Sequence, residues 1–169
     1  MSAPGDGGPV IAAVHPGQST AVVAEGARLA AALGRPLLCA HVAEDSYLTE
    51  WDRPEVREEA SLHPPTAAES DAQTARAELE ASIAAVIDGA DAAWSLRVLG
   101  GDPAKALARV AEELDARLLV VGTRQKGFGA ALEEFLTGSV AAKLAHEQDR
   151  PVVVVPVSNA QTERLTRRR

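Results

Sequence analysis

Five short apolar runs recur along this chain, and a stretch with a different periodicity separates each run from the next. The runs lie at 9–14, 36–42, 93–99, 117–121 and 152–155. Between them, apolar residues step by three and four, which is typical of amphipathic helices. The clearest stripe is Ala72, Ala75, Leu79, Ile83 and Val86. Strands that alternate with helices pair as a parallel sheet. The sequence therefore predicts an α/β fold: a five-stranded parallel sheet with helices on both faces.

The composition of the runs predicts where each strand lies in that sheet. The first, second and fourth runs are apolar throughout, as in strands buried on both faces, whereas the third alternates. We therefore expect the third strand at an edge and the fourth in the interior. Helix boundaries are also marked: Asp102-Pro103 is an N-cap followed by a first-turn proline, Ser19 or Thr20 can cap the first helix, and Gly34 can end it.

Composition excludes several classes of function. Aromatic residues make up 3% of the chain and the formal net charge is −7, so neither base stacking nor phosphate tracking on a nucleic acid is expected. One cysteine allows no intrachain disulfide. No apolar run approaches the length of a membrane-spanning helix, and the first ten residues do not resemble a signal peptide. We expect one cytoplasmic domain over 9–156, with flexible termini at 1–8 and 157–169, that binds no nucleic acid and no membrane.

The negative charge is concentrated in one segment. Residues 44–80 hold eleven Asp or Glu against three Arg, a net charge of −8. The part at 44–66 follows the second strand directly and is interrupted by Pro64 and Pro65. Its simplest interpretation is a solvated loop, and the functional alternative is a lid over a binding site.

Ligands of open α/β sheets bind beyond the carboxyl ends of the strands, where the strand order reverses. The connection after the fourth strand is the richest of these loops in glycine: it begins Gly122-Thr123-Arg124, continues through Gly127, and reaches Gly138-Ser139. Glycines let backbone N–H groups approach an anion, and a helix N-terminus adds unpaired donors. The stretch 130–136 could form one or two helical turns. The pattern favours a phosphate site, although tight turns also use such glycines.

Several segments together resemble the universal stress protein family. They are Leu38-Cys-Ala-His-Val42, Gly101-Asp-Pro103, Gly122-Thr-Arg, Gly138-Ser-Val and Arg150-Pro-Val-Val-Val-Val-Pro156. The resemblance covers about 9–156. It implies strand order 3-2-1-4-5, a homodimer, a role in stress tolerance and, as in many members, binding of ATP or another adenine nucleotide, with or without Mg²⁺.

The resemblance also implies which residues bind the nucleotide. They are His15, Val42, Gly122, Thr123, Arg124, Gly127, Gly138, Ser139 and Val140. Two positions depart from the ATP-binding pattern: His15 stands where the family has an acidic residue, and Gln125 where it has a second glycine, with Gly127 as a replacement. The alternative function is a dimeric interaction module that binds no nucleotide. An ATP-hydrolysing or phosphotransfer enzyme is least favoured, because no residue can be assigned as a catalytic base.

Other candidate residues are interpreted as structural. His15 and His41 follow or end neighbouring strands, but no third metal ligand is evident, so we expect histidines that line the site and no metal. His63 and His146 are expected at the surface, and Cys39 is interpreted as a small buried apolar residue.

The last strand carries the expected dimer contact. Its four residues, Val152, Val153, Val154 and Val155, are apolar on both faces, and the family's strand order places them at an edge. Exposed apolar edges are normally covered or paired. We therefore expect two copies to pair there about a two-fold axis.

Overall fold

The computed structural model describes residues 7–17, 20–43, 67–123 and 140–157. The strands are β1 (Val10–Val14), β2 (Leu37–Ala43), β3 (Trp94–Gly100), β4 (Leu118–Gly122) and β5 (Val152–Val155). All are paired in parallel, in the order β3-β2-β1-β4-β5. The predicted fold class and strand order are confirmed, and so are the edge position of β3 and the interior position of β4.

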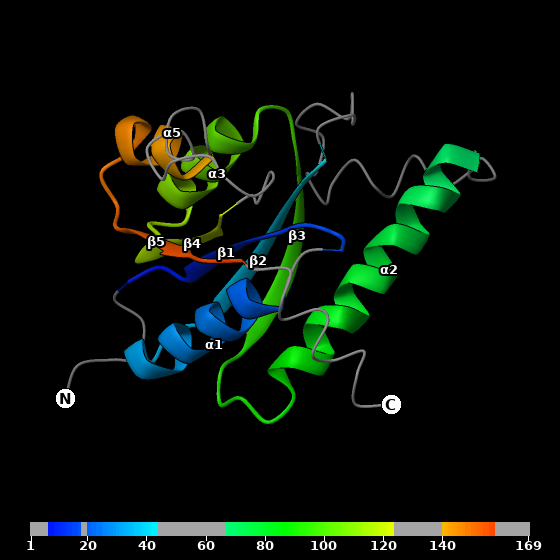
Figure 1. The fold of residues 1–169 in the computed structure, drawn as a ribbon, viewed down its shortest axis with the longest axis horizontal. Helices are drawn as coiled ribbons and strands as arrows, with labels where there is room; N and C mark the ends of the chain where they lie inside the picture. The colour runs from blue at the N-terminus through cyan, green and yellow to red at the C-terminus, as the bar shows by residue number, and fades with distance from the viewer. Residues whose placement is uncertain (1–6, 18–19, 44–66, 124–139, 158–169) are drawn as a thin grey trace, which may run out of the picture.

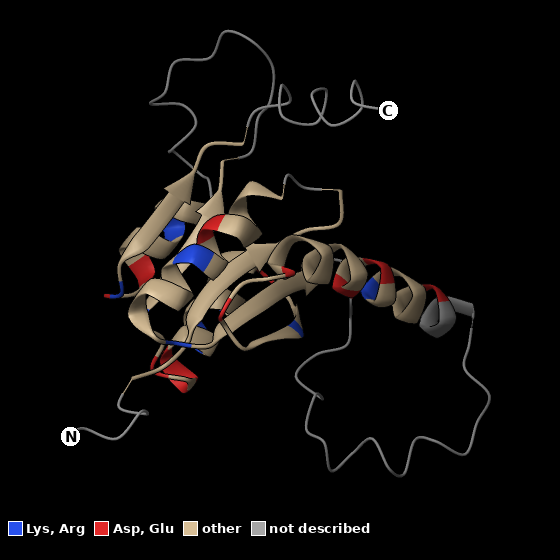
Figure 2. Cartoon of the chain, turned by 90° about the horizontal axis from the view of Figure 1, so that it is seen from below, with Lys and Arg blue, Asp and Glu red and all other residues tan. Residues whose placement is uncertain are grey.

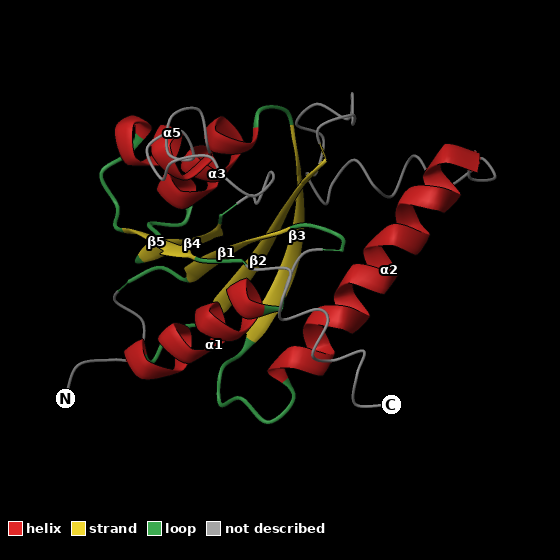
Figure 3. Ribbon diagram, in the orientation of Figure 1, coloured by secondary structure: helices red, strands yellow, loops and turns green. Residues whose placement is uncertain are grey.

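Helices cover both faces of the sheet (Figures 1 and 3). The helices α1 (Ala21–Leu33) and α2 (Ala67–Ile87) lie on one face, and α3 (Pro103–Glu113) and α5 (Val140–Glu147) lie on the other. Alternate residues of β1 point to opposite faces, as the period of a strand requires. Ile11 therefore packs under α3 and α5, while Val10 and Ala12 pack under α1.

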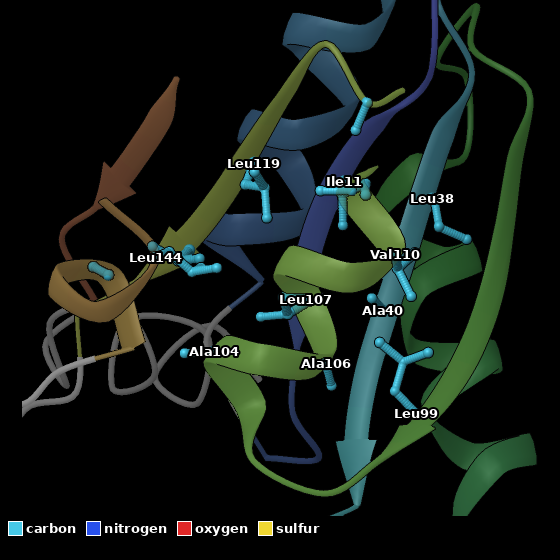
Figure 4. Packing of buried hydrophobic residues seen from close by; sticks show 14 residues of the cluster. Ile11, Leu38, Ala40, Leu99, Ala104, Ala106, Leu107, Val110, Leu119 and Leu144 are labelled. Atoms are coloured by element: carbon cyan, nitrogen blue, oxygen red, sulfur yellow. The ribbon is translucent and has the colours of Figure 1, made fainter. Parts of the chain in front are cut away.

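The core under α3 and α5 is made of aliphatic side chains (Figure 4). Ile11, Leu107, Leu119 and Leu144 are at most 1% exposed and come from β1, α3, β4 and α5. Burying one such side chain stabilises the fold by roughly 1.5–3 kcal/mol. Four different elements are thereby joined in one cluster, which fixes where α5 begins relative to the sheet.

On the other face, α1 lies close to the sheet at Gly26. A Cβ atom there would lie 3.1 Å from both Ala12 Cβ and Leu37 Cδ1. The absence of a side chain lets the helix axis approach β1 and β2 closely.

The stripe predicted for α2 is confirmed only in its second half. Leu79 and Ile83 are buried, whereas Ala72 and Ala75 are exposed. The reason is visible in Figures 1 and 2: the amino-terminal half of α2 projects past the sheet, and charged residues lie along it. The apolar stripe is therefore longer than the surface that covers it.

Two of the predicted helix ends are confirmed, and of the third, which named Ser19 or Thr20, the structure describes only Thr20. The Asp102 side chain accepts a hydrogen bond from Lys105 N at 3.1 Å, with Pro103 as the first helical residue, and Gly34 ends α1 with a left-handed backbone (φ 62°). Thr20 precedes α1 but makes no side-chain cap bond. Its backbone is already helical (φ −63°, ψ −12°), whereas a capping residue normally has an extended backbone.

The edge of the sheet where the strands begin, here called the amino edge, is closed by hydrogen bonds. The carbonyls of Pro9, Pro36 and Pro151 accept from Arg117 N, Val10 N and Leu119 N at 2.9–3.0 Å. Each proline lies just before a strand, supplies a carbonyl, and has no N–H that would need a partner.

Two further residues join this edge together. Gly8 N donates to Asp115 O at 3.1 Å, so Gly8, which we expected in a flexible terminus, is tied to the turn before β4. Arg150 donates from Nε to Ala116 O at 3.0 Å and forms an ion pair with Asp115 at 3.2 Å. The chain ends of the domain are therefore held against the same turn.

Candidate functional site

The opposite, carboxyl edge of the sheet carries the candidate site. The chain proceeds from β1 outward to β2 and β3 and then returns to the other side of β1 with β4 and β5. The order therefore reverses between β1 and β4, which is the position where open α/β sheets bind ligands. His15 follows β1 directly, and Gly122 and Thr123 end β4 and follow it.

The two predicted histidines of this edge are neighbours. Their ring centroids are 5.8 Å apart and their planes are inclined by 81°. His15 is exposed and its Nδ1 lies 2.7 Å from the carbonyl oxygen of Pro16. His41 is half-buried and its Nδ1 lies 3.1 Å from the carbonyl oxygen of Val14. The His41 side chain of β2 is therefore hydrogen-bonded to Val14, the last residue of β1.

Burial controls the charge of His41. Desolvation lowers the pKa of His41 below the ordinary histidine value, and this effect outweighs the hydrogen bond to Val14 O, which raises it. The nearby His15 ring lowers the same pKa further. His41 therefore favours its neutral form at the carboxyl edge.

Thr123 makes two hydrogen bonds to the end of β5 and the residues that follow it. Thr123 N donates to Val155 O at 3.0 Å, and Thr123 Oγ1 accepts from Val157 N at 3.0 Å. These bonds hold the chain beyond β5 against the end of β4. Because a hydroxyl is both donor and acceptor, the O–H of Thr123 can still donate to a ligand.

Val42 and Val140 lie on the same face of the sheet. Both are half-buried and pack against the cluster under α3 and α5. Val140 is in the first turn of α5, where backbone N–H groups have no partner within the helix. The structure therefore places at this edge all five predicted binding residues that it describes: His15, Val42, Gly122, Thr123 and Val140.

A basic residue that sequence reasoning missed lies in the same helix as Val140. Lys143 of α5 forms an ion pair with Asp102 at 3.4 Å, between the start of α5 and the start of α3. The hydrogen bond from Lys105 N is the largest influence that lowers the pKa of Asp102, which keeps the carboxylate charged. Asp102 is a helix cap, as predicted. The spacing of Lys143, three residues after Val140, is the signal that could have found it.

The remaining predicted residues lie outside the described part of the chain. They are Arg124, Gly127, Gly138 and Ser139, together with the segments 44–66 and 130–136. The proposed middle position of the loop, Gln125 or Gly127, falls in the same gap.

Two smaller predictions concern side chains outside the site. Cys39 is fully buried in β2, and desolvation raises the pKa of its thiol to about 12, which agrees with a structural role. His146 is exposed in α5, as predicted, and His63 lies outside the described residues. Within the described residues, no group of three or more His, Cys, Asp or Glu could hold a metal ion.

The strand expected to form the dimer contact is at an edge. Among the described strands β5 pairs only with β4, and Val154 is 40% exposed. Val153 and Val155 instead pack against the cluster under α1. Among the described residues, no helix is long and apolar enough to cross a membrane.

A parallel sheet of this order, with helices on both faces and polar groups at its reversal point, defines a Rossmann-like α/β protein. The model of the universal stress protein family matches residues 8–156, and the chain belongs to that family. The resemblance expected from the sequence is thereby confirmed. A search of curated proteins gives no significant match.

Solved structures share the fold at low sequence identity. A universal stress protein in complex with cAMP is 23% identical, with a TM-score of 0.56, and the match covers 89% of this chain and 98% of that one. The universal stress protein from Archaeoglobus fulgidus in complex with dAMP is 21% identical, with a TM-score of 0.55, over 86% and 95% of the two chains. UspA from Lactobacillus plantarum is 17% identical, with a TM-score of 0.59, over 88% and 97%.

Proposed function

We propose that this chain binds an adenine nucleotide at the carboxyl edge of its sheet and acts in the stress response through nucleotide occupancy. The observation that carries the proposal is the position of His15, Gly122 and Thr123 at the reversal point between β1 and β4. Membership of the family and the cAMP and dAMP complexes of two structural relatives support the choice of ligand.

The chemistry of the edge suits an uncharged base and a charged phosphate at different places. Val42 offers a half-buried apolar surface at the end of β2. The N-terminus of α5 offers a dipole that favours an anion. We therefore assign the base to the end of β2, and the phosphates to Gly122, Thr123 and Val140 together with Arg124, Gly127, Gly138 and Ser139.

Calorimetry with ATP, AMP and cAMP, each with and without Mg²⁺, tests the proposal. We expect saturable binding that Gly138→Val abolishes, because a side chain there would block the approach of the phosphates to the backbone. Ala90→Val, at an exposed position in the turn after α2 at the amino edge, is the control and should leave binding unchanged. No heat and no thermal shift with millimolar ATP and Mg²⁺ would refute nucleotide binding and favour the interaction module.

The proposal includes a homodimer through β5. A second copy pairing antiparallel about a two-fold axis would satisfy the free backbone groups of β5 and cover Val154. Val154→Lys should give monomers in sedimentation velocity at micromolar concentration. Leu33→Lys, at the 42% exposed end of α1, changes an equally exposed apolar residue and should leave a dimer. A monomeric wild-type protein would contradict the proposed homodimer and would leave the proposal of nucleotide binding unaffected.

A further inference from the structure

The histidine pair has a property that nucleotide binding does not use. Each ring makes its hydrogen bond through Nδ1, and each partner is a backbone carbonyl oxygen, of Pro16 for His15 and of Val14 for His41. A carbonyl oxygen can only accept. Both Nδ1 atoms must therefore carry the hydrogen, and in the neutral rings both Nε2 atoms carry the lone pair.

The hydrogen bond from Nδ1 to a backbone carbonyl is a feature that these two rings share with metal-binding histidines. Their second ring nitrogen almost always donates to a carbonyl or carboxylate, which fixes the tautomer and the orientation of the ring. With metal–nitrogen bonds of about 2.0–2.1 Å, one ion held by two imidazoles sets the ring centroids roughly 5–6 Å apart. The observed separation of 5.8 Å lies in that range.

We propose that His15 and His41 bind one divalent late transition ion, such as Zn²⁺ or Cu²⁺, through their Nε2 atoms. Neutral imidazole suits these ions, whereas Mg²⁺ and Ca²⁺ prefer oxygen ligands. Water or a bound anion completes the coordination, because the protein supplies two ligands.

The proposal departs from our expectation of no metal, which rested on the lack of a third ligand. It goes beyond the proposed function and does not depend on it, because the two rings meet without a nucleotide. The ion would lie at the end of β1, where it would place a positive charge beside the proposed phosphate site.

Isothermal titration of the apo protein with Zn²⁺ and no nucleotide tests the proposal directly. We expect one ion per chain in the wild type. His15→Ala should weaken the affinity by at least about tenfold, since even the outer-shell partners of metal-bound histidines contribute that much. His146→Ala removes an exposed histidine from α5 and should leave the affinity unchanged. Because His15 is exposed, its substitution does not disturb the core.

A measurement on the wild-type chain adds a readout that needs no variant. Long-range ¹H–¹⁵N spectra at pH 8 should show both rings protonated at Nδ1, and substoichiometric Cu²⁺ should broaden the signals of His15 and His41 before that of His146. An Nε2–H tautomer for either ring would overturn the proposal. So would Zn²⁺ affinity that is unchanged in His15→Ala or equally reduced in His146→Ala. Failure of nucleotide binding would leave all these results unaffected.

Discussion

The two edges of the sheet differ in what their polar groups bind. At the amino edge, the polar groups bond to one another: three proline carbonyls, Gly8 N and Arg150 connect the starts of the strands. At the carboxyl edge, the bonds that His15, His41 and Thr123 make to other described residues use only part of their hydrogen-bonding capacity. One edge therefore contributes chiefly to stability, and the other retains groups for a ligand.

This division has a cause in the direction of the chain. All five strands are parallel, so every strand begins at one edge and ends at the other. Dipoles and helix N-termini gather at the carboxyl edge, because α1, α3 and α5 all start there. A site at that edge can change its ligand without altering the bonds that close the amino edge.

The largest effect should follow from Gly8→Ala at the amino edge. The added Cβ would lie 2.1 Å from Asp115 O and 2.2 Å from Leu114 O, both backbone atoms that cannot move independently. We expect a loss of roughly 3 kcal/mol in urea unfolding, at the upper end of overpacking costs. Gly17→Ala at the carboxyl edge meets no atom within 4 Å and strains only its positive φ (74°), so it should cost about 1 kcal/mol. Equal losses would remove the distinction between the edges.

Arg150→Ala should have the next largest effect. The side chain is 23% exposed and bonds Ala116 O and Asp115, so its removal leaves a carbonyl without its donor. We expect a loss of about 2 kcal/mol in the free energy of unfolding. The control is Arg28→Ala, which breaks an ion pair with Glu25 on an arginine that is 64% exposed, and it should leave the unfolding curve unchanged. A wild-type curve for Arg150→Ala would show that the amino edge does not depend on it.

Asp102→Ala tests the stabilising bond of the carboxyl edge. It removes the cap of α3 and the ion pair to Lys143, and we expect a loss of about 1 kcal/mol, as for other N-caps. Asp102→Asn retains the capping oxygen and should unfold close to wild type. If Asp102→Ala cost more than Arg150→Ala, the carboxyl edge would be the more stabilising of the two.

The smallest effect is the acid dependence caused by His41. Because the folded pKa lies below the unfolded value of about 6.5, the unfolded chain takes up a proton first as the pH falls. The wild type should therefore lose stability as the pH drops through 6.5 toward the folded pKa. His41→Gln should flatten this slope between melts at pH 7.5 and 5.5, and the exposed His146→Gln should not. An unchanged slope in His41→Gln would mean that burial does not control this ring.

Much of the fold could be predicted because it depends on local patterns. Apolar runs without alternation indicated the interior strands β1, β2 and β4, although β5 is equally apolar and lies at an edge. Asp102-Pro103 correctly predicted the start of α3. The stripe of α2 was predicted too long, because periodicity does not say where the sheet beneath it ends. The Thr20 side chain makes no cap bond, because its backbone is already helical, and the residue type alone does not predict that conformation.

The candidate site was less accessible to sequence reasoning. The family's strand order predicted that His15 and His41 would be neighbours. Their tautomers could not be predicted, because these depend on which backbone carbonyls the rings face after folding. The pairing of Lys143 with Asp102 joins residues far apart in the sequence and depends on how α3 and α5 pack together.

The burial of Cys39 has a consequence for the redox chemistry of the molecule. Oxidants and alkylating reagents react with the thiolate, and a thiol with a pKa of about 12 is almost entirely protonated at neutral pH. The chain has no other cysteine. Hydrogen peroxide therefore finds no reactive thiol in the folded protein, so a response to oxidative stress through cysteine chemistry is not expected.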